Sequence, residues 1–176
     1  RTPSSAASDV YKRQTNMCIP VGVYVASQSG PQRIVCLTEE PTEILYLLGE
    51  EHRIVGITVY TVRPPEARER HPMVSAFIDG SVRKICELEP DLIIGFSDIQ
   101  ADLAAKLIKA NQQVLIFNQR TIEEILEVIL TIGRLVSAEE RAQHLVDGYR
   151  SAIEVAKERA NNCLLYTSDA ADEGVR

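Results

Sequence analysis

Short apolar runs alternate with amphipathic stretches along the chain from Arg33 onward. Four of the runs are four or five residues long and consist mostly of β-branched and aliphatic residues without polar alternation: 34–37, 54–57, 92–96 and 114–117. Uninterrupted apolar runs of this length are typical of strands that are buried on both faces of a parallel sheet. The pattern therefore predicts four buried parallel strands.

The stretches between these runs carry start and stop signals for helices. Pro41 suits the first turn of a helix, an apolar stripe follows it, and Gly49 suits the C-terminal cap. Capping boxes of the form Ser/Thr-x-x-Glu/Gln begin at Ser97, Thr121 and Ser137. We expect a helix after each box, the last of them a long helix that runs to about position 160.

Strands that alternate with helices indicate an α/β fold with a parallel sheet, covered on both faces in a three-layer, Rossmann-like arrangement. Ligands of such sheets bind beyond the carboxyl ends of the strands, where loops and helix N-termini converge. The segments expected at that edge are 38–40, 58–65, 96–98 and 118–120. Topology alone thus selects five candidate ligand contacts: Tyr60, Arg63, Phe96, Gln119 and Arg120.

Composition narrows the possible functions. The 176 residues are 45% hydrophobic and 25% charged, which is ordinary for a folded domain, and the net charge of -6 argues against a nucleic-acid surface. No apolar run approaches the roughly 20 residues that span a bilayer. The four cysteines have no CxxC spacing and the three histidines are scattered, so no metal site is expected.

Catalytic motifs are absent from the sequence. It has no glycine-rich phosphate loop and no G-x-S-x-G elbow, and the adjacent Glu39 and Glu40 suit a helix start better than a shared-proton pair. We therefore expect no enzyme activity and no cofactor. The aromatic and basic groups at the strand ends suit a large, flat or amphipathic ligand.

The two ends of the chain resemble translated sequencing-adapter DNA. SSAASDVYKRQ (4–14) and CLLYTSDAADE (163–173) are encoded by one DNA string and, in a shifted frame, by its reverse complement. We expect residues 1–14 and 163–176 to be adapter-derived and residues 15–32 to be a native leader or the remnant of a signal peptide.

Three blocks of the sequence together resemble one known family. RIVCLTEEPTEILYLLG (33–49), RIVGITVYTVRPPEA (53–67) and LEPDLIIGF (88–96) are similar to segments of the cobalamin and ferric-siderophore binding proteins of ABC importers. The resemblance covers residues 33–160 and implies two α/β lobes joined by a long helix. It implies that this chain holds an amino-terminal lobe, 33–136, and the connector helix, 137–162, with the second lobe beyond.

The resemblance also implies a function. A protein of this family would bind a corrinoid or a ferric chelate in a cleft between the lobes, in the periplasm or another extracytoplasmic space. The alternative is a cytoplasmic corrinoid carrier, or a metallocofactor-handling enzyme whose active residues lie in the missing half.

Site residues are carried over by position in the family. The ligand-facing aromatics fall on Tyr60, Phe77 and Phe96, and the last two are often tryptophan in the cobalamin binders. Arg63 or Arg120 would meet acidic groups on the ligand. The structural alternative is that Phe96 is the last core residue of its strand and Phe77 is a loop anchor.

One position departs from the family's pattern for docking to the membrane permease. The family often places a glutamate in the helix before the L-x-P-D block, where this chain has Arg83 beside Lys84. A like-charge encounter with permease arginines would oppose docking. Either Glu87 or another acid serves instead, or the protein does not serve an importer of that design.

Overall fold

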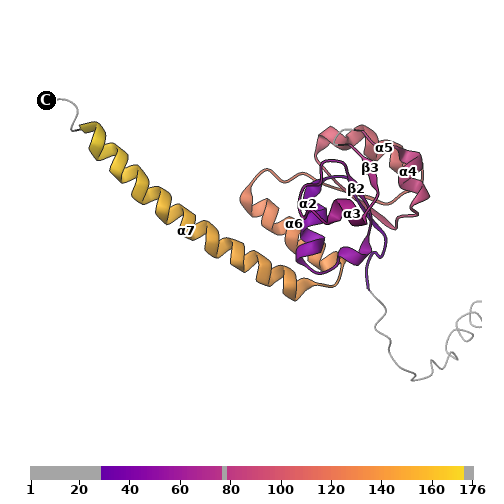
Figure 1. Ribbon diagram of the computed structural model, residues 1–176, viewed down its shortest axis with the longest axis horizontal. Helices are drawn as coiled ribbons and strands as arrows, with labels where there is room; N and C mark the ends of the chain where they lie inside the picture. The colour runs from indigo at the N-terminus through magenta and orange to yellow at the C-terminus, as the bar shows by residue number, and fades with distance from the viewer. Residues whose placement is uncertain (1–28, 77–78, 173–176) are drawn as a thin grey trace, which may run out of the picture.

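Strands and helices alternate along the chain in the computed structural model, which describes residues 29–76 and 79–172 (Figure 1). In chain order the elements are β1 (Ile34–Cys36), α2 (Glu39–Leu47), the 3-10 turn η1 (Glu51–Arg53), β2 (Ile54–Thr58), α3 (Ala67–Arg70), β3 (Met73–Ser75), α4 (Val82–Glu87), β4 (Leu92–Phe96), the 3-10 turn η2 (Asp98–Gln100), α5 (Ala101–Lys109), β5 (Val114–Phe117), α6 (Ile122–Leu135) and α7 (Glu139–Asp172).

The strands form one parallel sheet in the order β3-β2-β1-β4-β5. This confirms the predicted α/β fold class and the four predicted strands, with ends that differ by one residue at most. Strand β3 was not predicted. It has only three residues and the first of them, Met73, is exposed, so it leaves no apolar run in the sequence.

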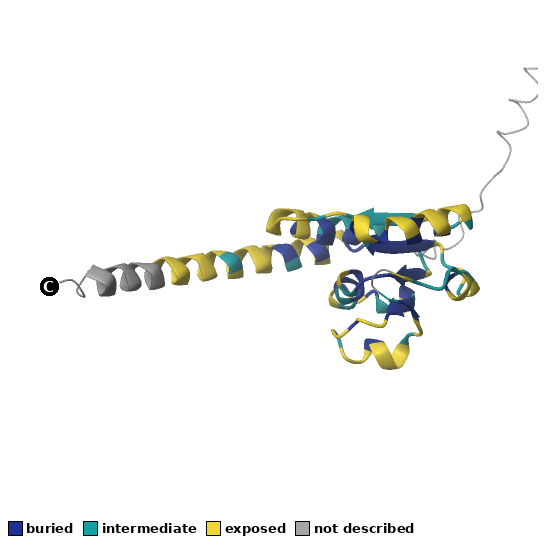
Figure 2. Ribbon diagram, turned by 90° about the horizontal axis from the view of Figure 1, so that it is seen from above, coloured by how far each residue is buried: buried dark blue, intermediate teal, exposed yellow. Residues whose placement is uncertain are grey.

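Helices cover both faces of the sheet. Cys36 of β1 packs on the face covered by α2, α6 and α7, whereas its neighbour Val35 packs on the face covered by α4 and α5. Successive residues of a strand point to opposite faces, so each face of β1 supplies one core. In Figure 2 the buried residues concentrate on the strands and on the helix sides turned toward them.

The strand order reverses direction beside β1. The chain moves outward from β1 through β2 to β3, and then returns to the other side of β1 with β4 and β5. The loops that follow β1 and β4 therefore diverge, which opens a crevice at the carboxyl ends of these two strands. This crevice is where a sheet of this topology holds a ligand.

Two helix-end signals of the sequence are confirmed. Gly49 has a φ of 68°, and its N–H and that of Glu50 donate to the carbonyls of Tyr46 and Leu45 at 3.0 and 2.8 Å, which is a Schellman cap. The capping box of Thr121 is complete, with reciprocal hydrogen bonds between Thr121 and the third helical residue.

The other two predicted capping boxes are wrong. Ser97 has a φ of 69° and makes no cap, because the Gln100 side chain accepts from the N–H of Phe96 instead. Ser137 also has a positive φ, and α7 begins two residues later at Glu139. The motif supplies suitable donors and acceptors, but tertiary contacts decide which backbone groups they meet.

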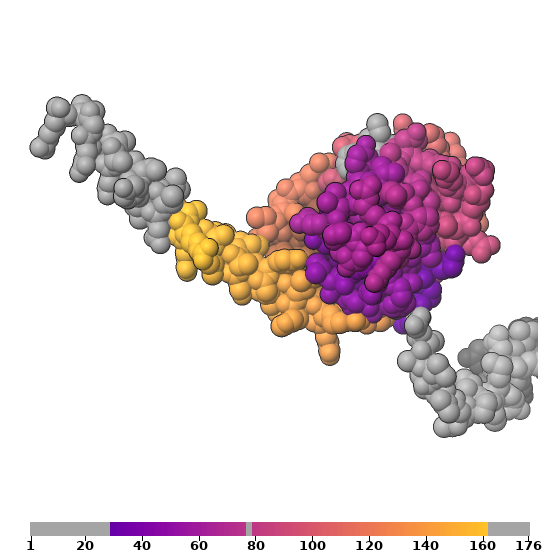
Figure 3. Space-filling model, viewed as in Figure 1, coloured from indigo at the N-terminus to yellow at the C-terminus, as the bar shows by residue number. Residues whose placement is uncertain are grey.

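Helix α7 leaves the body of the lobe. Its first turns pack against α6, with Ala142 and Val146 buried, and Figure 3 shows the following turns, up to residue 161, standing out from the rounded lobe. The helix continues to Asp172, through residues that the sequence analysis assigns to adapter DNA. The predicted domain boundaries, which concern the origin of each segment, stay predictions.

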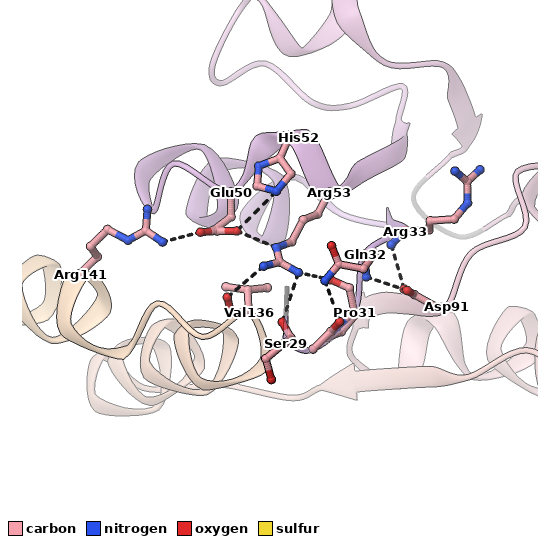
Figure 4. A network of polar contacts seen from close by, with 11 residues as sticks. Ser29, Pro31, Gln32, Arg33, Glu50, His52, Arg53, Asp91, Val136 and Arg141 are labelled. Atoms are coloured by element: carbon pink, nitrogen blue, oxygen red, sulfur yellow. Dashed lines mark hydrogen bonds and ion pairs between the residues drawn. The ribbon is translucent and has the colours of Figure 1, made fainter. Parts of the chain in front are cut away.

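A buried polar network ties the start of the lobe to the α6–α7 corner (Figure 4). Arg53 is 4% exposed, and its guanidinium donates to Glu50 Oε2 at 2.6 Å and to the carbonyls of Pro31 at 2.7 Å and Val136 at 3.3 Å. Arg141 of α7 binds the other oxygen of Glu50. The network thus joins the segment before β1, the turn after α2 and the first turn of α7.

Candidate functional site

Apolar side chains are exposed at the carboxyl edge of the sheet. Val59, Tyr60 and Val62 follow β2 and are 40%, 58% and 62% exposed, and Ile99, in the turn after β4, is 49% exposed. Exposed apolar groups that gather at a ligand-binding edge mark a contact surface, because a soluble protein gains nothing by leaving them in water. We call Val59, Tyr60, Val62, Phe96 and Ile99 the apolar wall.

The buried Thr58 hydroxyl holds the Tyr60 loop in place. The Thr58 hydroxyl donates to the carbonyl of Ser75 at 3.3 Å and accepts from the N–H of Tyr60 at 3.4 Å. The N–H of Val59 donates to the same Ser75 carbonyl at 2.9 Å. Because the backbone is fixed to β3 in this way, the Tyr60 ring lies outside the core.

Glu39 fixes the other end of this loop. Its Oε1 accepts from the N–H groups of Val62 at 3.2 Å and Arg63 at 2.9 Å. The Arg63 guanidinium also pairs with Glu39 at 3.7 Å and with Glu43 at 3.3 Å. Glu39 lies in the first turn of α2, as the sequence predicts, and it also binds the loop after β2.

Phe96 ends β4 and is partly buried, with Arg120 above it. The guanidinium carbon of Arg120 lies 5.7 Å from the centre of the Phe96 ring, within range of a cation–π contact. Arg120 Nη2 donates to Ser97 Oγ at 3.1 Å, Asp98 Oδ1 at 3.2 Å and Asn118 Oδ1 at 2.8 Å. One arginine thus connects the loops after β4 and β5.

The crevice beside β1 is held by two buried polar residues. Gln100 accepts from the N–H of Phe96 at 2.9 Å and donates to the carbonyl of Leu37 at 3.3 Å, which ties β4 to β1. The fully buried Ser97 donates to Asp98 Oδ1 at 2.6 Å. That hydroxyl is the main reason that the pKa of Asp98 lies below its ordinary value.

The structure places four of the predicted ligand residues at the same edge of the sheet. Tyr60 follows β2 and Phe96 ends β4, the two strands on either side of β1. Arg63 lies beside the Tyr60 loop and Arg120 over Phe96. Gln119, a candidate by topology, is half-buried nearby. Phe77 lies outside the described residues.

Sequence reasoning missed several residues of this edge. Val59 and Val62 flank Tyr60 in the segment TVYTV, where the predicted topology could have identified them as exposed. No sequence pattern indicated the contacts of Ser97 and Gln100 at the crevice. The capping-box motif predicted instead that both would cap a helix.

Arg83, at the position where the family often has a permease-docking glutamate, lies on α4. Arg83 donates to Glu87 one turn later at 2.7 Å, and both side chains are exposed. The positive charge of Arg83 is therefore matched by Glu87 on the same helix face. In the part of the chain that the structure describes, no group of three or more His, Cys, Asp or Glu could hold a metal ion, and no helix there is long and apolar enough to cross a bilayer.

The five-stranded parallel sheet with helices on both faces defines an α/β lobe of the binding-protein type, and sequence comparison agrees. The family described as periplasmic binding protein matches residues 34–169. The chain belongs to this family.

Individual relatives are similar over most of the chain. An uncharacterised ABC transporter substrate-binding lipoprotein of Bacillus subtilis is 29% identical over 77% of this chain and 44% of its own length. A cobalamin-binding protein of Halobacterium salinarum is 27% identical over 63% of this chain and 31% of its own length. The chain therefore spans less than half the length of these relatives.

A solved structure shows the same arrangement. The periplasmic vitamin B12 binding protein of Vibrio cholerae superposes with a TM-score of 0.66 at 25% identity, over 73% of this chain and 51% of its own. This agreement confirms that the lobe has the architecture of periplasmic binding proteins.

Proposed function

We propose that this chain forms one wall of the ligand cleft in the solute-binding protein of an ABC importer, and that the ligand is a corrinoid or a ferric chelate. The observation that carries the proposal is the apolar wall, which gathers exposed side chains from the loops after β2 and β4. Such a protein binds and releases its ligand without catalysis, outside the cytoplasmic membrane.

The chemistry of the wall supports a large, flat ligand. Tyr60 and Phe96 offer two aromatic faces at one edge of the sheet, on either side of β1, and two such faces suit a large ligand better than a small solute. Phenylalanine in place of the tryptophan that similar cobalamin binders often have keeps a stacking face and removes an indole N–H donor. The names of the cobalamin- and vitamin B12-binding relatives also favour a corrinoid.

One observation bears on the cytoplasmic-carrier alternative. The pairing of Arg83 with Glu87 occupies a carboxylate that could otherwise meet permease arginines. A carrier that docks on no permease would have no need of a free acid there. The importer function remains the proposal, because the relatives include an ABC transporter lipoprotein.

The Tyr60→Ala variant tests the proposal. Isothermal titration with cyanocobalamin and with ferric chelates measures affinity for the chain and its variant. Loss of one stacking ring should weaken binding about tenfold, by about 1.4 kcal/mol. Tyr149→Ala, which removes a partly exposed tyrosine from α7, is the matched control and should leave affinity unchanged. Equal affinities for Tyr60→Ala and the unchanged chain would remove the aromatic wall from the ligand site.

A further inference from the structure

We propose that the cleft wall selects a neutral or cationic ligand over an anionic one, because the chain's own carboxylates occupy the two arginines at this edge. The inference rests on the proposed function and narrows its ligand class. It replaces the expectation that Arg63 or Arg120 meets acidic groups on the ligand.

Arg63 is held by two carboxylates. Its guanidinium lies 3.7 Å from Glu39 and 3.3 Å from Glu43, both on α2. Glu39 is itself fixed by the two backbone N–H groups of the Tyr60 loop. The pair therefore belongs to the framework that positions the loop, and an incoming anion would have to compete with a carboxylate that cannot easily turn away.

Arg120 is held in a comparable way on the other side of the crevice. Asp98, Ser97 and Asn118 accept from the same nitrogen, Nη2, and the Phe96 ring lies under the guanidinium. Asp98 is ionised at neutral pH, as aspartates ordinarily are, so its charge balances that of Arg120. Arg120 thus stacks on Phe96 of the apolar wall, and Asp98 balances its positive charge.

The loops around the crevice carry more acids than bases. Beside the two arginines, the first turns of α2, η2 and α6 supply these carboxylates: Glu39, Glu40, Asp98, Glu123 and Glu124. Glu40 and Glu123 are exposed. Like charges brought together at a binding surface oppose association, and opposite charges speed it. A ligand with several free carboxylates would be repelled, whereas a neutral or cationic macrocycle would not.

Two porphyrins of equal shape and opposite charge test the inference. One carries four N-methylpyridinium groups and the other four phenylsulfonate groups, and fluorescence titration with the 176-residue chain measures both affinities. At low ionic strength the cationic porphyrin should bind at least about tenfold more tightly, and the ratio should shrink at about 0.5 M salt, where charges are screened.

Matched variants separate the wall from the overall charge. Glu40→Gln with Asp98→Asn removes two negative charges at the crevice, and Asp147→Asn with Glu158→Gln removes two from α7. The first pair should reduce the affinity ratio about fivefold or more, since it acts at short range, and the second should change it less than about twofold.

The outcomes distinguish this inference from the proposed function. If the anionic porphyrin binds as tightly as the cationic one or more tightly, the charge selection is wrong and the aromatic wall stands. Equal effects of the two double variants would also overturn it, because only net charge would then matter. Binding of neither porphyrin would overturn the wall and this inference together.

Discussion

Ser97 combines a buried hydroxyl with a backbone conformation that belongs to glycine. Its φ of 69° and ψ of 164° lie in a region where a Cβ atom is strained, and the residue has no exposed surface. The strain stands at the carboxyl end of β4, where the hydroxyl binds Asp98 and Arg120. The chain therefore tolerates an unfavourable conformation at the crevice in order to hold the loop that supports the wall.

Two substitutions at this position separate strain from hydrogen bonding. Ser97→Ala and Ser97→Gly both remove the hydroxyl, but only glycine relieves the strain. Relief of strain favours glycine, and the larger entropy that glycine loses on folding offsets part of this gain. The Ser97→Gly variant should therefore be about 1 kcal/mol more stable than Ser97→Ala. Urea unfolding measures both. An alanine variant as stable as the glycine variant would show that the backbone relaxes at no cost.

Helices α6 and α7 pack closely because a glycine without a side chain lies at their contact. A Cβ atom at Gly133 of α6 would stand 2.4 Å from the Cβ of Ala142 in α7, far inside contact distance. Gly148, further along α7, would meet nothing within 4 Å. Only one of these two helical glycines is required for packing. The neighbouring element, and not helix propensity, decides which one.

This contrast predicts opposite effects of the same substitution. Gly148→Ala should stabilise the protein by up to about 1 kcal/mol through helix propensity. Gly133→Ala should destabilise it by about 1–3 kcal/mol, because α7 must move away from α6. Thermal unfolding of the two variants gives the comparison. A stabilised Gly133→Ala protein would mean that the two helices separate freely.

The network around Glu50 joins parts of the molecule that are far apart in sequence. Burial of the Glu50 carboxyl raises its pKa, but hydrogen bonds and charges from Arg53 and Arg141 outweigh this effect, and the pKa lies below its ordinary value. A depressed carboxyl pKa stabilises the folded state fully above the ordinary glutamate pKa. The stabilisation is lost as pH falls through the folded value.

Acid titration of stability tests this connection. The unfolding free energy of the chain should fall as pH drops below the ordinary glutamate pKa of 4.5, and Glu50→Gln should flatten that fall. At pH 7 the variant should be less stable by about 3 kcal/mol, since it leaves the Arg53 guanidinium buried without its counter-charge. Glu158→Gln, on the exposed part of α7, should leave the pH dependence unchanged. An unchanged slope in Glu50→Gln would place the acid sensitivity elsewhere.

Much of the fold follows from local patterns. The apolar runs identify four of the five strands, and Gly49 and Thr121 mark helix ends correctly, because burial on both faces and end-capping are properties of a few consecutive residues. The parallel arrangement follows from the alternation of strands and helices. It places Tyr60 and Phe96 at the edge where ligands bind before any contact is known.

The tertiary structure decides which side chains pair with one another. Arg63 binds a carboxylate 24 residues away, and Arg120 a hydroxyl 23 residues away, and neither pairing has a sequence signal. The short strand β3 exists because β2 offers it a partner, and Ser97 is strained because Arg120 and the β4 loop hold it. Local sequence determines which elements form, since periodicity is a short-range property. The charge that a ligand meets depends on side chains brought together only when the sheet assembles.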